Sequence, residues 1–540
     1  MESHEMLPVK TAQVNIEDEK GHYATQYPGH RTDETRNTST RVRVRTLGRS
    51  HDGTLTPSQR LFSFAQIFFF ALSYMSSWEA IASNIAFFFW NGGPRALSFG
   101  YFIVITGVMC QVASMAEMAS VQPIAGAQYH WTHYLAPPAH RRFITWMQGW
   151  ITWFSWISLL AGVANIAALM IQALVIASYP TYVPHGWHVT LIIYALLIVQ
   201  GLMNQFAFWT IPWIEMLSGL LHIIMWIVFV SVLVTLAPRH SADFVFLEKS
   251  ALSGWTNEYV SFNLGMLTAT WGFVGFDGAV HMSEEVRKAR HAVPRAMFWS
   301  IVMNGALAYG MVLVILFCAG NVEDLLSSGY PLLLICINAT QSVKAGSAMV
   351  GLSMIVTLAC VLGSIASASR LTWAWSRDGA LPSYFAKIDP KHRIPVRSVW
   401  LPVFIVMLLA LLNIGSSIAF NVIVALSTLG LYQSYMMAIA CMLWARWDKR
   451  VEPSGWSLGR FGVYINIFAV VYSMYIMVFL CFPSFLPVTA AGMNYALPIN
   501  AFVQLVALAL WFFWAKNNWK GLNKTVIDAV VADSDRNTKD

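Results

Sequence analysis

Charged residues are scarce in this chain of 540 residues. Asp, Glu, Lys and Arg together make up 11% of it, whereas apolar residues make up 57%. Soluble domains carry about 25% charged residues, so the composition argues against a soluble globular protein. The 23 Trp and 33 Phe residues fit the aromatic belts found at membrane interfaces, and they fit lipid-facing packing equally well. The composition favours a membrane protein.

Cysteine is also rare. The chain has six cysteines, without a CxxC pair or a zinc-binding spacing, and they are typical of small buried hydrophobic residues. The motif HExxH and the phosphate-binding P-loop are absent from the sequence, which disfavours a zinc protease and an ATP-driven pump. We therefore expect no catalytic residue, no metal site and no cofactor.

The first 60 residues lack an apolar stretch that could serve as the core of a signal peptide. They are polar, and we predict a disordered cytoplasmic N-tail over residues 1–60. Residues 61–515 are predicted to form one transmembrane domain, followed by a short cytoplasmic C-tail over residues 516–540. Of three Asn-x-Ser/Thr sequons, only that of Asn338 falls on the predicted exterior side, which makes Asn338 a candidate glycosylation site.

Long apolar runs are abundant between the two tails. About twelve stretches of roughly 20 apolar residues follow one another, each long enough to cross a bilayer. With both termini on one side, that side collects all 34 Lys and Arg residues except Arg95, Arg239, Lys249 and Lys344. An excess of Lys and Arg marks the cytoplasmic side, so both termini are predicted to be cytoplasmic. The net charge of +7 therefore indicates topology rather than a nucleic-acid partner.

The sixth predicted span contains the run Trp271-Gly272-Phe273-Val274-Gly275-Phe276-Asp277-Gly278. Such a density of glycine predicts a broken helix, and a break frees N–H and C=O groups that lipid cannot hydrogen-bond. A carboxylate inside the membrane is costly unless it is paired, and it therefore indicates a functional site. Many secondary transporters hold their substrates and coupling ions at broken helices near the bilayer midplane.

The first predicted span contains Ser76-Ser77-Trp78-Glu79. Two spans that are five apart thus each have a polar, weakened centre with a Trp and an acid. In transporters built from inverted five-helix repeats, spans 1 and 6 are partners. We predict a substrate site between them, formed by Ser76, Ser77, Trp78, Glu79, Trp271, Gly272, Phe273, Gly275, Phe276 and Asp277.

Several motifs, in order, carry a family resemblance. They are Asn91-Gly92-Gly93-Pro94, Ala116-Glu117-Met118-Ala119, Gly275-Phe276-Asp277, Ser283-Glu284-Glu285-Val286-Arg287, Val293-Pro294-Arg295-Ala296 and Ser376-Arg377-Asp378-Gly379. From about residue 60 to 515, the chain resembles the amino acid–polyamine–organocation (APC) superfamily. Within it, the chain most resembles the fungal amino acid/choline transporter branch, which includes GABA and choline permeases.

The resemblance implies an all-α membrane fold of about 12 transmembrane helices, with a five-plus-five inverted repeat and broken helices 1 and 6. It also implies alternating access, with the substrate held at the two breaks. One departure concerns helix 1, where many permeases of the superfamily have a Gly-Ser-Gly-like break whose N–H groups hold a substrate carboxylate. This chain has Ser76-Ser77-Trp78 there, and the adjacent Glu79 favours a substrate with a cationic head.

The two acids have alternative roles. Asp277 is a candidate for binding a substrate ammonium, for exchanging a proton, or for capping the second half of helix 6. Glu79 has no break-forming glycine beside it, and a cation or proton site is favoured over pairing with a polar neighbour. The rings of Trp78, Trp271, Phe273 and Phe276 are candidates for cation–π contacts, with ordinary packing as the alternative.

Charged residues at the predicted cytoplasmic ends are candidates for a gate. By resemblance, the segment between spans 6 and 7 helps to close an inward gate through ion pairs, with solvated surface charge as the alternative. The gating candidates are Glu117, Glu285, Arg287, Arg295, Arg377 and Asp378, together with the neighbouring Glu284 and Lys288.

Two further pairs of polar residues lie inside the predicted spans. Glu215 and His222 lie on one face of span 5, where a helix-packing pair is favoured over a proton relay. Ser364 and Ser367 in span 8 offer oxygen atoms, so a sodium site stays open.

Taken together, these features predict a secondary transporter of the plasma membrane that imports small amines or amino acids, such as choline or GABA. We expect alternating access, with transport either coupled to protons or facilitative. The expected partners are the small-molecule substrate and the lipid bilayer, and the oligomeric state is open. Two alternatives remain, namely a non-transporting nutrient sensor on the same fold and a channel.

Overall fold

The computed structural model describes residues 60–390, 394–415, 417–451, 455–489, 493–522 and 527, with the backbone alone for 417–425. The predicted N-tail, apart from Arg60, and most of the predicted C-tail lie outside these residues. Within them the chain is helical, and its one β-bridge joins Phe62 to Val286.

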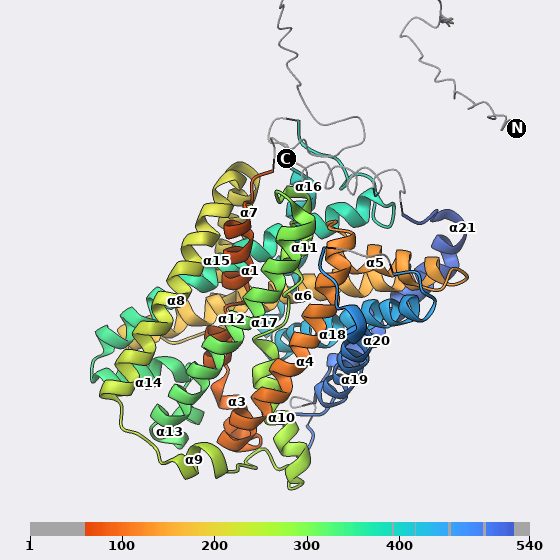
Figure 1. Cartoon of the computed structure of the whole chain (residues 1–540). Coiled ribbons are helices and arrows are strands. Elements are labelled where there is room, and N and C mark those ends of the chain that lie inside the picture. Colours follow the sequence, from red (N-terminus) through yellow and green to blue (C-terminus); the bar gives the residue numbers. More distant parts are fainter. Residues whose placement is uncertain are drawn as a thin grey trace, which may run out of the picture. The chain divides into compact units, whose positions relative to one another are not determined.

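Ten segments of the described chain contain a helix long and apolar enough to cross a membrane. Figure 1 shows these helices packed side by side in one bundle. They are α4 (Gly93–Val121), α6 (Arg141–Ser178), α7 (Gly186–Phe206), α8 (Ile211–Leu236), α12 (Ala289–Cys318), α15 (Val343–Arg377), α16 with α17 (Val396–Ala410 and Leu412–Gly415), α18 (Ser417–Trp447), α19 (Gly462–Leu480) and α20 (Ala496–Leu510).

The predicted spans 1 and 6 are both interrupted. The first comprises α1 (Phe64–Met75), α2 (Ser77–Ser83) and α3 (Ile85–Trp90), and the other comprises α10 (Glu258–Trp271) and α11 (Gly278–His281). Each piece is shorter than a bilayer-spanning helix requires. The all-α fold is thus confirmed, whereas twelve membrane crossings and an inverted repeat stay predictions.

Short helices connect the long ones. These are α5 (Gln128–Leu135), α9 (Ala242–Leu247), α13 (Val322–Ser327), α14 (Pro331–Thr340) and α21 (Lys516–Asn518), with a 3-10 turn at Ser283–Glu285. Asn338, the glycosylation candidate, is exposed on α14.

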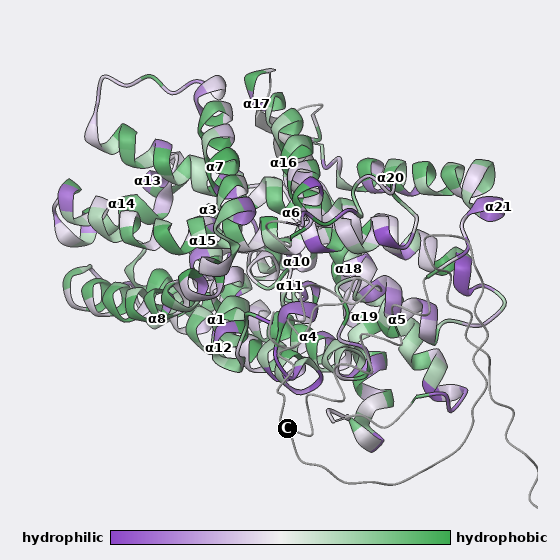
Figure 2. Cartoon of the chain, turned by 90° about the horizontal axis from the view of Figure 1, so that it is seen from above, coloured by the Kyte–Doolittle hydropathy of each residue, from purple (hydrophilic) through white to green (hydrophobic). Residues whose placement is uncertain are grey.

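The distribution of polarity is that of a multi-pass membrane protein. Large apolar side chains lie on the outside, among them Phe513, Leu217 and Trp209, each at least 66% exposed. Figure 2 shows these hydrophobic helices in green. The carboxylic acids of Glu79, Glu117, Glu215 and Asp277 lie inside instead, each at most 3% exposed. Acids in membrane proteins face the interior of the bundle because lipid cannot solvate them.

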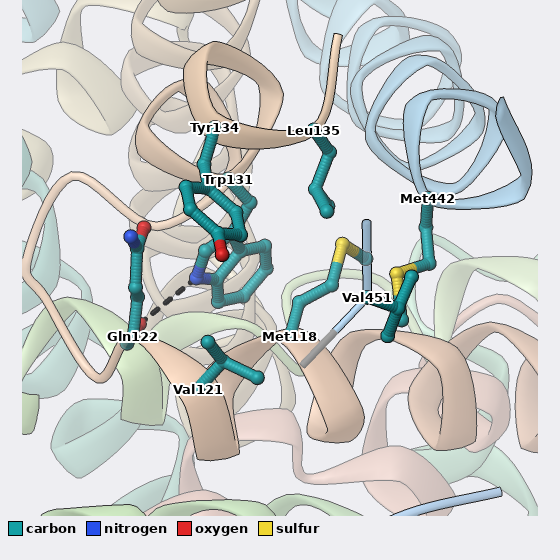
Figure 3. Close-up of a pocket in the computed structure, with 8 residues that line it drawn as sticks. All are labelled: Met118, Val121, Gln122, Trp131, Tyr134, Leu135, Met442 and Val451. Carbon is teal, nitrogen blue, oxygen red and sulfur yellow. Dashed lines mark hydrogen bonds between the residues drawn. The ribbon is translucent and has the colours of Figure 1, made fainter. Parts of the chain in front are cut away.

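Helix α5 packs against both α6 and α18. The indole N–H of Trp131 donates to the carbonyl of Gln122 at 2.9 Å, which ties α5 to the end of α4. Figure 3 shows these residues around a small apolar pocket closed by Met442 of α18 and by Val451. This fastening matters because Gln128, at the start of α5, reaches the candidate site.

Close backbone contacts position the broken helices. A Cβ atom at Gly265 in α10 would lie 2.1 Å from the carbonyl oxygen of Asn91, at the end of α3. Real Cβ atoms do not approach that closely, so the two broken spans touch through a glycine.

We expect Gly265→Ala to lower the free energy of unfolding by about 1–3 kcal/mol, because the added methyl group overpacks this contact. Thermal unfolding of the detergent-solubilised protein measures the effect. The matched control is Gly329→Ala, because nothing lies within 4 Å of a Cβ at Gly329. Equal melting temperatures for the two variants would contradict the tight contact.

The imidazole of His133 in α5 gives a pH prediction. Burial, followed by the nearby Arg141 and Arg142, lowers the pKa of His133 to about 4. As the pH falls below about 6.5, the unfolded chain takes up a proton that the folded chain rejects, so the free energy of unfolding falls until about pH 4.

We expect His133→Gln to remove this loss, which is on the order of 2 kcal/mol in full. The variant should therefore gain stability relative to the unsubstituted protein between about pH 6.5 and pH 4 and show no such gain above that range. Melting curves recorded as a function of pH test this prediction. A constant difference between the two proteins across the range would refute it.

Candidate functional site

The break in the first span is centred on Ser76. This residue adopts the left-handed conformation with φ 41°, and its hydroxyl donates to the carbonyl of Ser73 at 2.5 Å. Helix α2 then restarts with the bond from the Ala80 N–H to the Ser76 carbonyl. A serine in this conformation is uncommon, so the hydroxyl bond helps to hold a turn for which glycine is the usual residue.

The break in the sixth span covers residues 272–277. Gly275 has φ +89°, and a Cβ there would lie 2.9 Å from both Leu159 Cδ2 and Tyr74 Oη. The position therefore requires glycine for its conformation as well as for space. At Gly272, a Cβ would lie 3.0 Å from the carbonyl oxygen of Ser77. The two breaks thus lie against each other, as the sequence predicts.

A cavity of about 40 Å³ lies between the two breaks. A volume of this size holds a few water molecules, so an organic substrate requires the cavity to open further. Residues from α1, α2, α6, α15 and the sixth span line it: Tyr74, Met75, Ser76, Glu79, Ala80, Ser83, Leu159, Val163, Ile166, Trp271, Val274, Thr357 and Cys360.

Glu79 is the one acid among these lining residues. Its Oε1 lies 2.9 Å from Nδ1 of His222 in α8, and its Oε2 has no hydrogen-bond partner among the described residues. A buried carboxylate oxygen without a partner is costly. The cavity therefore contains one strong acceptor that a ligand can satisfy.

The structure places the predicted substrate-binding residues in three groups. Ser76, Glu79 and Trp271 line the cavity, whereas Ser77, Gly272 and Gly275 form the contacts of the breaks. The remaining residues lie behind the cavity wall. The Trp78 indole donates to the carbonyl of His222 at 3.2 Å, Phe273 packs edge-on against Tyr101, and Phe276 packs against Tyr435.

Asp277 is enclosed by hydrogen-bond donors rather than exposed to the cavity. Its Oδ1 accepts the Tyr435 hydroxyl at 2.5 Å, and its Oδ2 accepts Gln128 Nε2 at 2.5 Å and the Trp156 indole at 3.0 Å. His281 Nε2 lies 3.2 Å from Oδ2. The side chain makes no capping bond to α11, so the interpretation of Asp277 as a side-chain cap is wrong. These donors hold the carboxylate instead.

Glu215 and His222 do not contact each other, but both serve helix packing, the role that the sequence favours. The hydroxyl of Ser73 donates to Glu215 Oε2 at 2.7 Å, whereas His222 contacts Glu79. Both side chains point from α8 toward the first span. Their shared helix face reflects this contact with α1 and α2 rather than a contact with each other.

Ion pairs close the end of the bundle near Arg370. Arg370 Nε donates to Glu285 at 2.9 Å, Arg377 bonds Glu284 at 3.2 Å, and Arg446 bonds Glu117. These pairs join α15 to the turn after α11, and α18 to α4. Solvated surface charge, the alternative for Glu285 and Arg377, does not fit because each lies in a partly or fully buried pair.

The other gating candidates are placed differently. Arg287 donates through Nε to the carbonyl of Arg60 at 3.1 Å, beside the bridge between Phe62 and Val286. Asp378 accepts the Tyr129 hydroxyl at 2.8 Å and lies 2.9 Å from His130 Nε2. Arg295 is exposed on α12, in keeping with the solvated alternative.

Sequence reasoning missed several residues of the site. Tyr74, Thr357 and Cys360 line the cavity, and Gln128, Trp156, His281 and Tyr435 surround Asp277. Only Gln128 had a signal, because it follows the motif of Glu117. The others lie within apolar helices, where spacing alone does not distinguish a polar contact from packing.

The Arg370–Glu285 pair gives a test of the closed end. We expect Glu285→Gln to cost about 3–5 kcal/mol, because it leaves the guanidinium of Arg370, which is 3% exposed, without its carboxylate. Arg370→Gln should cost a similar amount. The double variant should recover about 1–3 kcal/mol relative to the sum of the two changes, because the two residues interact directly.

Thermal unfolding of the four proteins in detergent gives this coupling energy. Lys249→Gln with Glu258→Gln is the control cycle, since that pair is exposed on both sides and exposed pairs contribute about 0–1 kcal/mol. Additive effects at Arg370 and Glu285 would refute the structural role of the pair.

Comparison with known proteins identifies the family. The family model described as amino acid permease matches residues 62–503. Amino-acid permease 2 of Neurospora crassa is 28% identical over 476 residues, covering 86% of each chain.

Two other relatives are similar to this chain over most of its length. The choline transporter of Saccharomyces cerevisiae is 26% identical over 476 residues, or 86% of this chain and 84% of that protein. An amino-acid permease of Arabidopsis thaliana is 29% identical over 453 residues, or 80% of this chain and 87% of that protein. The chain is an integral membrane protein that belongs to the amino acid permease family of the APC superfamily.

Proposed function

We propose that the protein is a proton-linked secondary transporter of the plasma membrane that imports small amines or amino acids, with choline and GABA as the leading candidates. The observation that carries this proposal is the Glu79 carboxylate on the wall of the cavity between the two breaks. A charge inside a membrane protein persists when it has a functional partner. A substrate ammonium supplies that partner.

The surroundings of Glu79 favour a cationic head. Its Oε1 is oriented by His222 while its Oε2 stays available, and the half-buried ring of Trp271 lines the same cavity. A carboxylate together with an aromatic face attracts ammonium groups through charge and cation–π interactions. The hydroxyl group of Thr357 lies on the same wall and serves as a hydrogen-bond donor for a substrate carboxylate.

Access to the cavity is asymmetric. Toward the Arg370 end, the buried pairs of Glu285 and Glu284 and the enclosed Asp277 lie between the cavity and the outside. Toward the other end, exposure rises along the first span, from the buried Glu79 to the half-buried Ser83 and the exposed Asn84. In the proposed cycle, the substrate enters past Ser83, and the ion pairs at the Arg370 end open afterwards to release it to the cytoplasm.

The proposal predicts that Glu79→Gln weakens uptake of cationic substrates. A hydrogen bond to a charged group contributes about 1.5–3 kcal/mol, so KM should rise roughly 10- to 100-fold. Trp78→Phe should have a smaller effect, because Trp78 lies behind the cavity wall. Uptake of labelled choline, GABA, lysine and alanine by cells expressing each variant measures this.

The matched control is Glu258→Gln, which removes an exposed acid paired with Lys249. Uptake by the Glu79 variant equal to that of the unsubstituted protein would exclude Glu79 from the substrate site. A competition panel of the same four compounds at two pH values tests substrate class and proton coupling together. Absence of uptake of every compound, with normal surface expression, would refute the transport proposal itself.

A further inference from the structure

The imidazole of His281 is held at both ring nitrogens by hydrogen-bond acceptors. Nδ1 lies 2.7 Å from the carbonyl oxygen of Ala125, and Nε2 lies 3.2 Å from Oδ2 of Asp277. Both side chains are fully buried. Turning the ring over would direct C–H groups at both acceptors, so the observed orientation is the one that bonds.

The two contacts of His281 determine how many protons the histidine and Asp277 must hold together. A carbonyl oxygen can only accept, so Nδ1 carries a proton and donates it to Ala125. A neutral histidine would then present its lone pair at Nε2 to an ionised Asp277, which also offers only lone pairs. A hydrogen bond between Nε2 and Oδ2 therefore requires one additional proton, held either on His281 or on Asp277.

This requirement distinguishes His281 from the other histidine–acid pairs of the described chain. His130 contacts Asp378 through Nε2, and His222 contacts Glu79 through Nδ1. In each of these pairs the second ring nitrogen has no hydrogen-bond partner among the described residues. A neutral ring with its proton on the contacting nitrogen satisfies both pairs. Among the three, the pair of Asp277 and His281 alone needs the extra proton.

The neighbouring groups do not supply the proton that is missing between Nε2 of His281 and Oδ2 of Asp277. Tyr435 of α18 donates to the other oxygen of Asp277, and Tyr74 of α1 stacks on Trp156, which donates its indole N–H to Oδ2. Gln128 of α5 also donates to Oδ2. The charged groups that line a small cavity together with His281 are Glu284, Glu285 and Arg370.

A connection leads from the pair to the closed end of the bundle. A small cavity of about 10 Å³, enough for one water molecule, touches His281 together with Ala125, Glu285 and Arg370. The N–H of Ala125 donates to Glu284 Oε1 at 3.2 Å, while its carbonyl accepts from His281. Asp277 is thus linked through one imidazole and the backbone of Ala125 to the Glu284–Arg377 ion pair.

We propose that the Asp277–His281 pair carries the coupling proton of the transport cycle. This inference rests on the proposed transport function. When the pair is loaded, Nε2 and Oδ2 share a proton and the break of the sixth span is fastened to α5, α6 and α18. When the pair releases this proton to water, His281 stays neutral with its Nδ1–H bonded to Ala125, and the Asp277 anion faces the lone pair of Nε2. That repulsion loosens residues 272–277.

The test uses the full-length protein reconstituted in liposomes with labelled choline and labelled GABA. The key variant is His281→Gln, whose amide group donates to Asp277 without taking up or releasing a proton. It should exchange substrate in counterflow, whereas its accumulation of substrate driven by a pH gradient should fall to a ratio of about one, the value without coupling.

The matched control is His130→Gln, which removes a buried histidine from a pair that needs no extra proton. It should retain gradient-driven accumulation. Gradient-driven accumulation by His281→Gln equal to that of the unsubstituted protein would overturn the inference.

A second measurement does not depend on transport. Because the folded pair holds an extra proton, stability falls as rising pH removes it. The melting temperature of the unsubstituted protein should therefore fall more steeply with rising pH than that of His281→Gln. Parallel curves would overturn the inference even if transport is observed. If the unsubstituted protein shows no exchange and no accumulation, the transport function is refuted. The melting curves would still test the Asp277–His281 pair in that case.

Discussion

The hydrogen bonding of one buried carboxylate organises the interior of this protein. A broken helix inside a lipid-facing bundle frees backbone groups and loses the rigidity of a continuous helix, so the surrounding protein must hold it. Asp277 provides this by accepting bonds from Gln128, Trp156 and Tyr435 and by contacting His281. These residues come from α5, α6, α18 and α11. One side chain therefore joins the break of the sixth span to three other helices.

The first span follows the same principle with different partners. Its acid, Glu79, and its hydroxyl, Ser73, both bond to α8, through His222 and Glu215. The difference lies in what is left unsatisfied. The donors around Asp277 occupy both of its oxygens, whereas Glu79 retains a free oxygen on the cavity wall. In the proposed transport cycle the two acids therefore have separate tasks, in which Glu79 faces the substrate and Asp277 controls the broken helix of the sixth span.

Much of this arrangement was predictable from the sequence. The interruptions at Ser76 and at Gly272–Asp277 follow from local polarity and glycine content, and so does the burial of the acids. Ion pairing was expected for the segment that contains Glu285 and for Arg377. The sequence did not show that Glu285 pairs with Arg370 and that Arg377 pairs with Glu284. The capping role considered for Asp277 was wrong because long-range donors outcompete the local backbone for its oxygens. Trp78 was predicted as a substrate residue, yet the rotation of α2 after the left-handed turn at Ser76 directs it toward His222.

The sequence by itself determined the class of protein, the positions of the two breaks and the family. These depend on composition and on short motifs, which act within a few residues of the chain. The tertiary structure alone decided which acid lines the cavity and which histidine needs an additional proton. Those properties depend on contacts such as Tyr435 with Asp277 and Ala125 with His281, which join residues more than 150 positions apart. Only the packing of the helices fixes which lone pairs and donors meet there.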